Sequence, residues 1–290
     1  MKWQLRCLIG TAKALLPFQE ELRHLKDLVV GYQRNPQQDT ATIRDGLTMI
    51  DWLGDLSGRT ILEVGSGWQP MVPMLLSSAG AERVYMTDLH RLMRKGTIAA
   101  AEQSIRDNWA EISVRLNRAR DRLDEMRNLV YMAPCDCRNL PLRSESIDIL
   151  VSRACLEHIP RGVIEGIFRE AARILRPGGC MLHLIDYSDH WSHRDRSITD
   201  VNFLQYPDWL FRLTSIHPQN YQNRLRHPEF VEMMENAGSR VRKVQAEVNQ
   251  SCRDALGAMR ITARFQRFSI EDLAITGGIL FTEKASSVEN

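Results

Sequence analysis

The sequence lacks the features that mark secreted, membrane-spanning or nucleic-acid-binding proteins. Its six cysteines form no Cys-x-x-Cys pair, which argues against a zinc knuckle or a disulfide framework and fits reduced thiols in the cytosol. A formal net charge of only +2 gives no broad positive field for nucleic acid. Arg6 and Lys13 interrupt the first apolar stretch, so we expect neither a signal peptide nor a membrane span. These absences predict a cytoplasmic protein with no nucleic-acid partner.

The composition is that of an ordinary globular protein. The chain has 290 residues, 43% hydrophobic and 26% charged, enough for one large α/β domain with additions. Residues 1–56 have the pattern of a helical region. Trp3, Leu8 and Leu15 belong to an amphipathic stretch that predicts a helix docked on the domain. The alternative is a helix that lies on a membrane surface and makes a peripheral membrane contact.

Short β-rich runs alternate with helical patterns from residue 57 onward. Strands are predicted at residues 60–64, 83–87, 129–133, 147–151 and 180–185, with two last strands at 240–248 and 278–281. Such alternation indicates an α/β fold with a doubly wound, mostly parallel, Rossmann-like sheet, here of seven strands. We expect residues 57–186 to form the core and residues 229–290 the C-terminal part of the sheet.

Two stretches exceed a minimal unit of this kind. A long helical stretch is predicted up to about Arg127, and residues 105–126 carry apolar side chains at alternating steps of four and three. This pattern favours a seam packed within the protein, and the alternatives are a homodimer contact or a lid. Residues 187–228 are too long for a plain connection and are rich in histidine and aromatic residues. They predict an insertion after the fifth strand that binds the acceptor.

A glycine turn follows the first strand at Glu63-Val-Gly65-Ser-Gly67. Glycines let the backbone approach a bound cofactor closely. The third glycine of a dinucleotide fingerprint is replaced by Pro70, which argues against NAD. Asp88 ends the second strand roughly twenty residues later, where an acid accepts hydrogen bonds from both ribose hydroxyls of an adenosine. A helix cap is the structural alternative for Asp88.

Further motifs follow in the order of the strands. Asp136 and Cys137 come after the third strand and before a Leu-Pro-Leu run, and Asp136 is a candidate partner of an adenine amino group or a plain turn residue. The fourth strand continues through Ser152 and Arg153 toward Leu-Glu-His-Ile. The helix that precedes the fifth strand ends in Arg-Ile-Leu-Arg-Pro-Gly-Gly, a helix stop followed by a strand.

This series of motifs resembles the class I S-adenosylmethionine-dependent methyltransferases, particularly their broad type 11 group, over about residues 58–186. The resemblance implies S-adenosylmethionine as cofactor and a set of donor-binding residues. These are Glu63, Gly65 and Gly67 at the methionine moiety, Asp88 with Leu89 at the ribose, Asp136 and Cys137 at the adenine, and Ser152 and Arg153 at the amino-acid end. One departure is Gln69, where the family often has glycine.

The catalytic candidates stand at the ends of the fourth and fifth strands. Methyl transfer from a sulfonium needs alignment and exclusion of water, and a hydroxyl acceptor also needs a base. We predict His190 as that base, oriented by Asp189 or Asp186, with His158 as the second candidate. No metal site is expected, because His183 lies within the strand and points away from Asp186.

Three functions remain open at this point. The first, which we favour, is O-methylation of a sugar or glycan-like hydroxyl on a small-molecule acceptor. The second is C- or N-methylation of a lipophilic or quinone-like acceptor, and the third is a non-catalytic scaffold that keeps the donor fold. A looser similarity supports the first: residues 183–190, Asn202 and residues 223–226 resemble methyltransferases of bacterial glycan or secondary-metabolite pathways.

Overall fold

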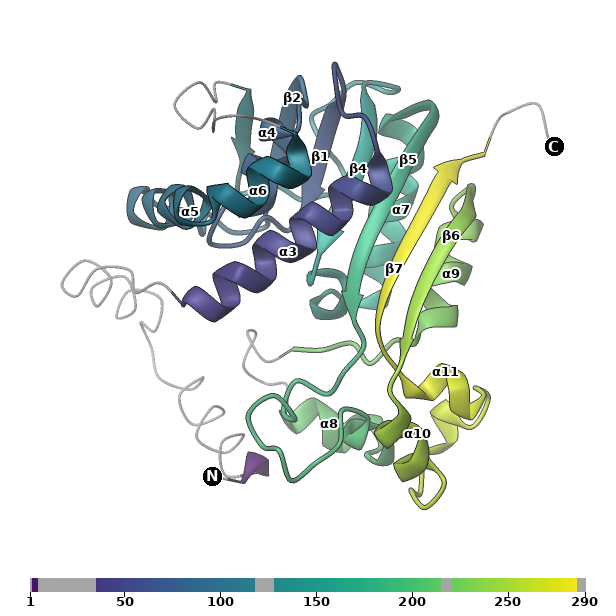
Figure 1. The fold of residues 1–290 in the computed structure, drawn as a ribbon. Helices are drawn as coiled ribbons and strands as arrows, with labels where there is room; N and C mark the ends of the chain where they lie inside the picture. The colour runs from purple at the N-terminus through teal and green to yellow at the C-terminus, as the bar shows by residue number, and fades with distance from the viewer. Residues whose placement is uncertain (1, 5–34, 118–127, 215–220, 286–290) are drawn as a thin grey trace.

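A computed structural model describes residues 2–4, 35–117, 128–214 and 221–285. Its centre is a seven-stranded sheet in the order β3-β2-β1-β4-β5-β7-β6, shown in Figure 1. The strands are β1 Thr60–Val64, β2 Arg83–Thr87, β3 Leu129–Met132, β4 Ile147–Arg153, β5 Leu175–Asp186, β6 Ser239–Val248 and β7 Ile275–Lys284. The first five are mutually parallel, and β7 runs antiparallel to both β5 and β6. The predicted doubly wound, mostly parallel sheet is confirmed.

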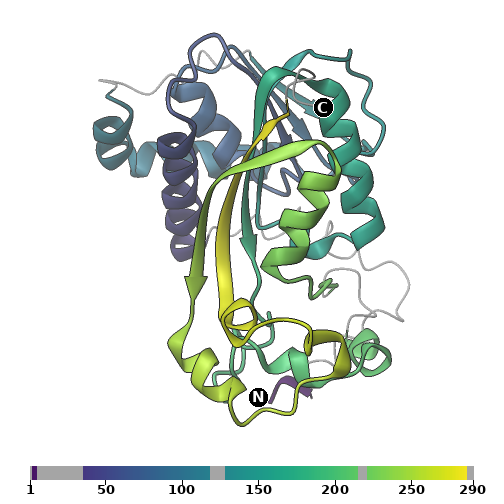
Figure 2. The same ribbon diagram turned by 90° about the vertical axis from the view of Figure 1, so that its right-hand side faces the viewer.

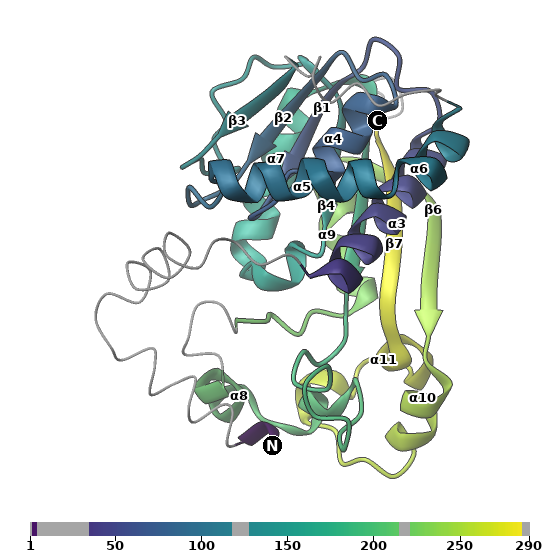
Figure 3. The same cartoon turned by 60° about the vertical axis from the view of Figure 1, so that its left-hand side comes forward.

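Helices cover both faces of this sheet (Figure 2). The helices and the 3-10 turns (η) are α3 Pro36–Leu53, α4 Met71–Ser78, α5 Lys95–Asp107, α6 Trp109–Leu116, η2 Leu156–His158, α7 Arg161–Ile174, η3 Asn202–Gln205, α8 Asp208–Thr214, α9 His227–Asn236, α10 Gln250–Leu256, η5 Ala263–Phe265 and α11 Ile270–Ala274. α7 and α9 pack on one face, whereas α3, α4 and α5 lie on the other, as Figures 2 and 3 show together. Each face has its own cluster of buried apolar side chains. Leu62 and Phe168 belong to the cluster under α7 and α9, and Leu47 and Leu75 belong to the cluster of α3, α4 and α5.

The helical stretch predicted up to about Arg127 consists of two helices within the described residues, α5 and α6. The helix is interrupted at Asn108, between α5 and α6. α6 ends at Leu116, and the capping residue Asn117 has a left-handed φ of 50°. The apolar seam is nevertheless packed, because Ile105 and Ile112 are fully buried against α3 and α4. The packed seam thus accounts for the pattern as far as Leu116, and residues 118–127 lie outside the description.

A second layer of structure forms beyond the C-terminal ends of β4 and β5. Residues 249–274 leave the sheet between β6 and β7 and pack with the predicted insertion, so that α8, α10 and α11 gather at one end (Figure 1). Phe203, Phe211 and Phe265 share one apolar cluster here. The guanidinium of Arg226 is fully buried and donates to the carbonyls of Tyr187 (2.8 Å) and Leu273 (3.1 Å) and to that of Ile275.

The first described residues belong to this same layer. The Trp3 ring lies 6.3 Å from that of Trp191 and 5.5 Å from that of Tyr206, and its backbone N–H donates to Asp195 at 2.8 Å. Residues 5–34, which hold most of the predicted amphipathic stretch, lie outside the described residues. Among the helices that the structure describes, none is long and apolar enough to cross a bilayer.

Candidate functional site

The glycine turn after β1 is fastened to the end of β2. The N–H groups of Gly65 and Ser66 both donate to the Thr87 carbonyl at 2.9 Å. Gly65 and Gly67 have φ values of +74° and +64°, which a side chain would strain. A Cβ on Gly65 would meet the Cys155 sulfur at 2.1 Å, whereas none of the described residues comes within 4 Å of a Cβ on Gly67. Gly65 is therefore needed for packing, and Gly67 borders open space.

Asp88 lies against this turn, as the resemblance implies. Its Oδ2 accepts from the Gly67 N–H at 3.1 Å and its Oδ1 accepts from the His90 N–H at 3.0 Å. The carboxylate is held in place by two backbone donors and keeps further lone pairs for a ligand. The neighbouring Leu89 is 60% exposed, so its side chain is available to cover a bound group.

Glu63 is the buried acid of the donor half. Burial raises the pKa of its carboxyl to about 7. Its Oε2 and the Nε2 of Gln69 are buried without a hydrogen-bond partner among the described residues. Unpaired buried polar groups are costly, and a ligand that carries an ammonium and a carboxylate would satisfy both. The residues present therefore fit the methionine end of the donor.

Asp136 and Cys137, which are expected at the adenine, lie in different environments. Asp136 is half exposed and pairs with Arg138, whose Nη2 lies 2.6 Å from Oδ2, and these hydrogen bonds lower the pKa of Asp136. Burial raises the pKa of the Cys137 thiol to about 11, and its sulfur lies 3.1 Å from the Thr87 hydroxyl. Cys137 is thus a packed neutral thiol beside the turn.

Ser152 and Arg153 are both engaged within the protein. The Ser152 hydroxyl lies 2.7 Å from His183 Nδ1 in the buried interior, so its side chain is directed into the core. Arg153 pairs with Asp45 of α3 at 2.8 Å. His183 points away from Asp186, as alternation along a strand requires.

Four titratable side chains meet where β4 and β5 end. His190 Nε2 lies 3.4 Å from Asp186 Oδ2, and the rings of His158 and His190 are 4.9 Å apart. Glu157, which the sequence interpretation missed, is 2% exposed beside them. We call Glu157, His158, Asp186 and His190 the strand-end cluster. It borders a cavity of about 240 Å³ whose walls include Trp191.

The two histidines of the strand-end cluster have pKa values that are shifted in opposite directions. Burial by itself lowers the pKa of His190, but Asp186 outweighs it and raises the pKa. Burial also opposes ionisation of Asp186, yet His190 and Ser188 together lower its pKa. The pKa of His158 is lowered by desolvation. His190 is therefore the stronger base of the two.

Asp189, the other predicted partner of His190, is turned elsewhere. Its carboxylate accepts from the Trp191 N–H at 3.0 Å and from the Asn202 amide at 3.3 Å, within the buried loop. Burial raises the pKa of Asp189 to about 6. The structure thus pairs His190 with Asp186, and Asp189 shapes the loop.

Residues 221–223 hold the cluster together. The Tyr221 carbonyl lies 2.8 Å from His158 Nδ1, and Gln222 Nε2 donates to the Ser188 carbonyl. The Asn223 amide donates to the carbonyls on either side of Glu157 and His158, those of Leu156 (2.7 Å) and Ile159 (2.8 Å), and its N–H donates to the Glu157 carbonyl at 2.9 Å. The letters Leu-Glu-His-Ile marked the position of Glu157, but nothing local in the sequence signals this support.

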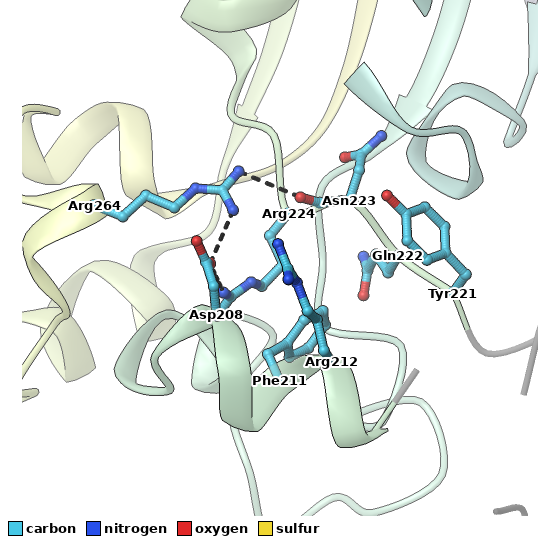
Figure 4. Close-up of a pocket in the computed structure, with 8 residues that line it drawn as sticks. All are labelled: Asp208, Phe211, Arg212, Tyr221, Gln222, Asn223, Arg224 and Arg264. Carbon is cyan, nitrogen blue, oxygen red and sulfur yellow. Dashed lines mark hydrogen bonds and ion pairs between the residues drawn. The ribbon is translucent and has the colours of Figure 1, made fainter. Parts of the chain in front are cut away.

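A second pocket of about 190 Å³ adjoins the histidine cavity and shares Phe211 and Gln222 with it. Figure 4 shows Arg264 and Tyr221 on opposite sides of this pocket, with Arg212 between them. Arg264 lies 3.1 Å from Asp208 and donates to the Asn223 carbonyl at 3.4 Å. The space beside the strand-end cluster is consequently lined by guanidinium, amide and phenol groups.

The fold and the donor half define a class I, S-adenosylmethionine-dependent methyltransferase domain. Residues 62–183 match the model of the family described as methyltransferase domain, so this part of the chain is a methyltransferase domain whose cofactor is S-adenosylmethionine. The match covers β1 to β5 up to His183, and therefore includes the glycine turn and Asp88.

Similarity to individual proteins is low. The chain is 24% identical over 159 residues to the ubiquinone/menaquinone biosynthesis C-methyltransferase UbiE of Nitrosospira multiformis, which is 54% of this chain and 55% of that relative. The matched region thus spans about half the length of this curated relative.

Solved structures share the fold. Geranyl diphosphate C-methyltransferase from Streptomyces coelicolor is 12% identical with a TM-score of 0.52, over 88% of this chain and 85% of that chain. A phosphoethanolamine N-methyltransferase of Haemonchus contortus is 16% identical with a TM-score of 0.50, over 84% of this chain and 53% of that chain.

Proposed function

We propose that this chain transfers the methyl group of S-adenosylmethionine to an oxygen of a small-molecule acceptor, with a sugar or glycan-like hydroxyl favoured. The observation that carries the proposal is the contact of 3.4 Å between His190 and Asp186 at the C-terminal end of β5. Ligands of open α/β sheets bind beyond this edge. A hydroxyl is a weak nucleophile until its proton is removed, and His190 is placed to remove it.

The reaction then needs little else from the protein. His190 takes the hydroxyl proton, the oxygen attacks the methyl carbon in line with the sulfur, and the carbon–sulfur bond breaks to leave S-adenosylhomocysteine. Asp186 stabilises the imidazolium that forms. The sulfonium supplies the activation, so alignment and exclusion of water supply the rest of the rate.

The walls of the two adjoining pockets suit a polar acceptor. Arg264, Tyr221, Gln222 and Arg194 offer several donors and acceptors of hydrogen bonds to a hydroxyl-rich molecule. A hydrophobic acceptor would form no hydrogen bonds with these groups, whereas a hydroxyl-rich acceptor would.

A second candidate is C- or N-methylation of a lipophilic, quinone-like acceptor. The similarity to UbiE, a ubiquinone/menaquinone biosynthesis C-methyltransferase, favours it. The third reading, a scaffold without activity, is disfavoured by the intact glycine turn, by Asp88 and by Glu63 Oε2, which is buried without a hydrogen-bond partner among the described residues.

A donor-coupled screen tests the choice. The full chain is incubated with S-adenosylmethionine and with nucleotide sugars, glycans, phenols or quinone precursors, and S-adenosylhomocysteine is quantified. The Asp88→Ala variant serves as the donor-binding control. We expect turnover with hydroxyl-bearing sugars, and turnover confined to quinone precursors would overturn the proposal.

A further inference from the structure

Glu157 is a fully enclosed acid with no internal partner. It is 2% exposed, and neither carboxylate oxygen has a hydrogen-bond partner among the residues that the structure describes. An unpaired carboxylate in such a place is costly, and buried charges in proteins are generally paired or bound to metal ions. Among the described residues no Lys or Arg forms an ion pair with Glu157, and the cationic group nearest in effect is the His190 imidazole. A cation bound between this acid and the neighbouring imidazoles would supply the missing partner.

Two imidazoles complete a ligand set with this acid. The potential ligand atoms of Glu157, His158 and His190 all lie within 4.8 Å of one another. Ligands bound at about 2.1 Å to an ion of zinc size lie no more than about 4 Å apart, so small side-chain rotations close the site. His158 is exposed toward the cavity, which leaves an entry path for an ion.

The surroundings of both histidines have the form that metal sites use. Metal-binding histidines commonly give their second ring nitrogen to a carbonyl or a carboxylate, which fixes the ring. His158 has the Tyr221 carbonyl at 2.8 Å from Nδ1, and His190 has Asp186 at 3.4 Å from Nε2. Asn223 holds the backbone of Glu157. The His158 ring and the Glu157 backbone are therefore held in advance, and the His190 ring lies beside Asp186.

We propose that Glu157, His158 and His190 bind one divalent transition-metal ion. Two imidazoles and one carboxylate favour Zn²⁺, Co²⁺, Fe²⁺ or Mn²⁺ over Mg²⁺, which prefers oxygen ligands and water. The set leaves at least one coordination position open toward the cavity.

The consequence for catalysis rests on the proposed function. An acceptor hydroxyl oxygen in the open position becomes more acidic, as bound water does. Its proton leaves to Asp186, the oxygen attacks the methyl carbon, and the carbon–sulfur bond breaks to give S-adenosylhomocysteine. His190 is then a ligand, whereas in the metal-free protein it is the base.

Metal titration tests the site without any acceptor. The tag-free, full-length chain is stripped with a chelator and titrated with Co²⁺ followed by visible absorption, and with Zn²⁺ and Mg²⁺ followed by calorimetry. We expect one site for Co²⁺ and Zn²⁺ and an affinity at least 10-fold lower in Glu157→Gln and in His158→Ala. The matched control is His193→Ala, a cavity histidine whose ring lies 5.4 Å from His190 and which is outside the ligand set. Its affinity should be unchanged.

The outcomes separate this proposal from the proposed function. Absence of a single-equivalent Co²⁺ or Zn²⁺ site, or equal losses in Glu157→Gln and His193→Ala, overturns the metal site. Because Glu157→Gln can disturb folding, donor affinity and thermal unfolding are measured for each variant, and His158→Ala at the cavity surface gives the second reading. Metal binding without turnover of any hydroxyl acceptor would leave the site standing and refute the O-methylation proposal. Full turnover by the stripped protein would support the O-methylation proposal and overturn the role given to the metal ion in catalysis.

Discussion

Glu63 should make donor binding depend on pH in a narrow and predictable range. Burial raises the pKa of this carboxyl to about 7, so it is mostly protonated at pH 6 in the donor-free protein. The resemblance places it at the methionine moiety, whose ammonium is best bound by a carboxylate. Donor binding below pH 7 must therefore first release the proton of Glu63, and binding weakens as pH falls.

The size of the effect follows from the pKa. If only the ionised form of Glu63 binds the donor, affinity falls about 30-fold between pH 8 and pH 5.5, or roughly 2 kcal/mol at 1.36 kcal/mol per pH unit. Glu63→Gln cannot titrate, so its affinity should be low and nearly flat over this range. The matched control is Glu82→Gln, an exposed position before β2, which should keep the slope of the wild type.

Calorimetry in two buffers with different ionisation enthalpies measures both affinity and proton release. Wild-type protein should release close to one proton per donor near pH 6 and almost none at pH 8, and Glu63→Gln should release none. A wild-type affinity that is flat from pH 5.5 to 8, or a slope that survives in Glu63→Gln, would refute the reasoning.

Three further predictions concern single side chains. Asp88→Ala should lose the ribose hydrogen bonds and weaken donor binding by about 2–4 kcal/mol in calorimetry, and unchanged affinity in a folded variant would contradict the assignment. His190→Ala should lower kcat by roughly 10²–10⁴-fold and spare donor affinity. If His158→Ala is inactive while His190→Ala is active, the two roles are exchanged, and if both are active the acceptor needs no protein base. Glu157 has a pKa raised by burial to about 8, so its ionisation opposes folding as pH rises from 4.5 through 8. With chelator present, Glu157→Gln should gain stability over wild type by on the order of a few kcal/mol at pH 9 and little at pH 5, and a difference independent of pH in thermal unfolding would contradict this.

Local patterns predicted β1 and β2 well, because the residues that determine these strands are close in sequence. β1 and β2 have the predicted bounds, since each is a buried β-rich run that ends at a glycine or an aspartate. Parallel neighbours bring their C-terminal ends to one edge, and this places Asp88 against Gly67.

The acceptor half depends on contacts that spacing does not determine. Asp186 and Asp189 are equally plausible partners of His190 in the sequence, and the choice follows from Trp191 and Asn202, which bind Asp189. The apolar pattern does not predict the helix break at Asn108, because the spacing of the apolar residues continues unchanged from α5 to α6. Residues 221–223 hydrogen-bond to residues 156–159, which are far away in the chain, so no local pattern predicts this support.

The buried guanidinium of Arg226 has a consequence for how the fold tolerates changes in the segment before it. Arg226 follows the segment 188–225 and donates to the carbonyl of Tyr187, which precedes it, so the two ends of this segment are joined. The Tyr187 hydroxyl also lies 3.2 Å from His227 Nδ1. Contacts on the core thus close the loop, whatever lies between its ends. Doubling the length of a flexible loop costs only about 0.6 kcal/mol in closure entropy. The length and sequence of residues 188–225 can therefore change at a low cost in closure entropy while the sheet keeps its fold.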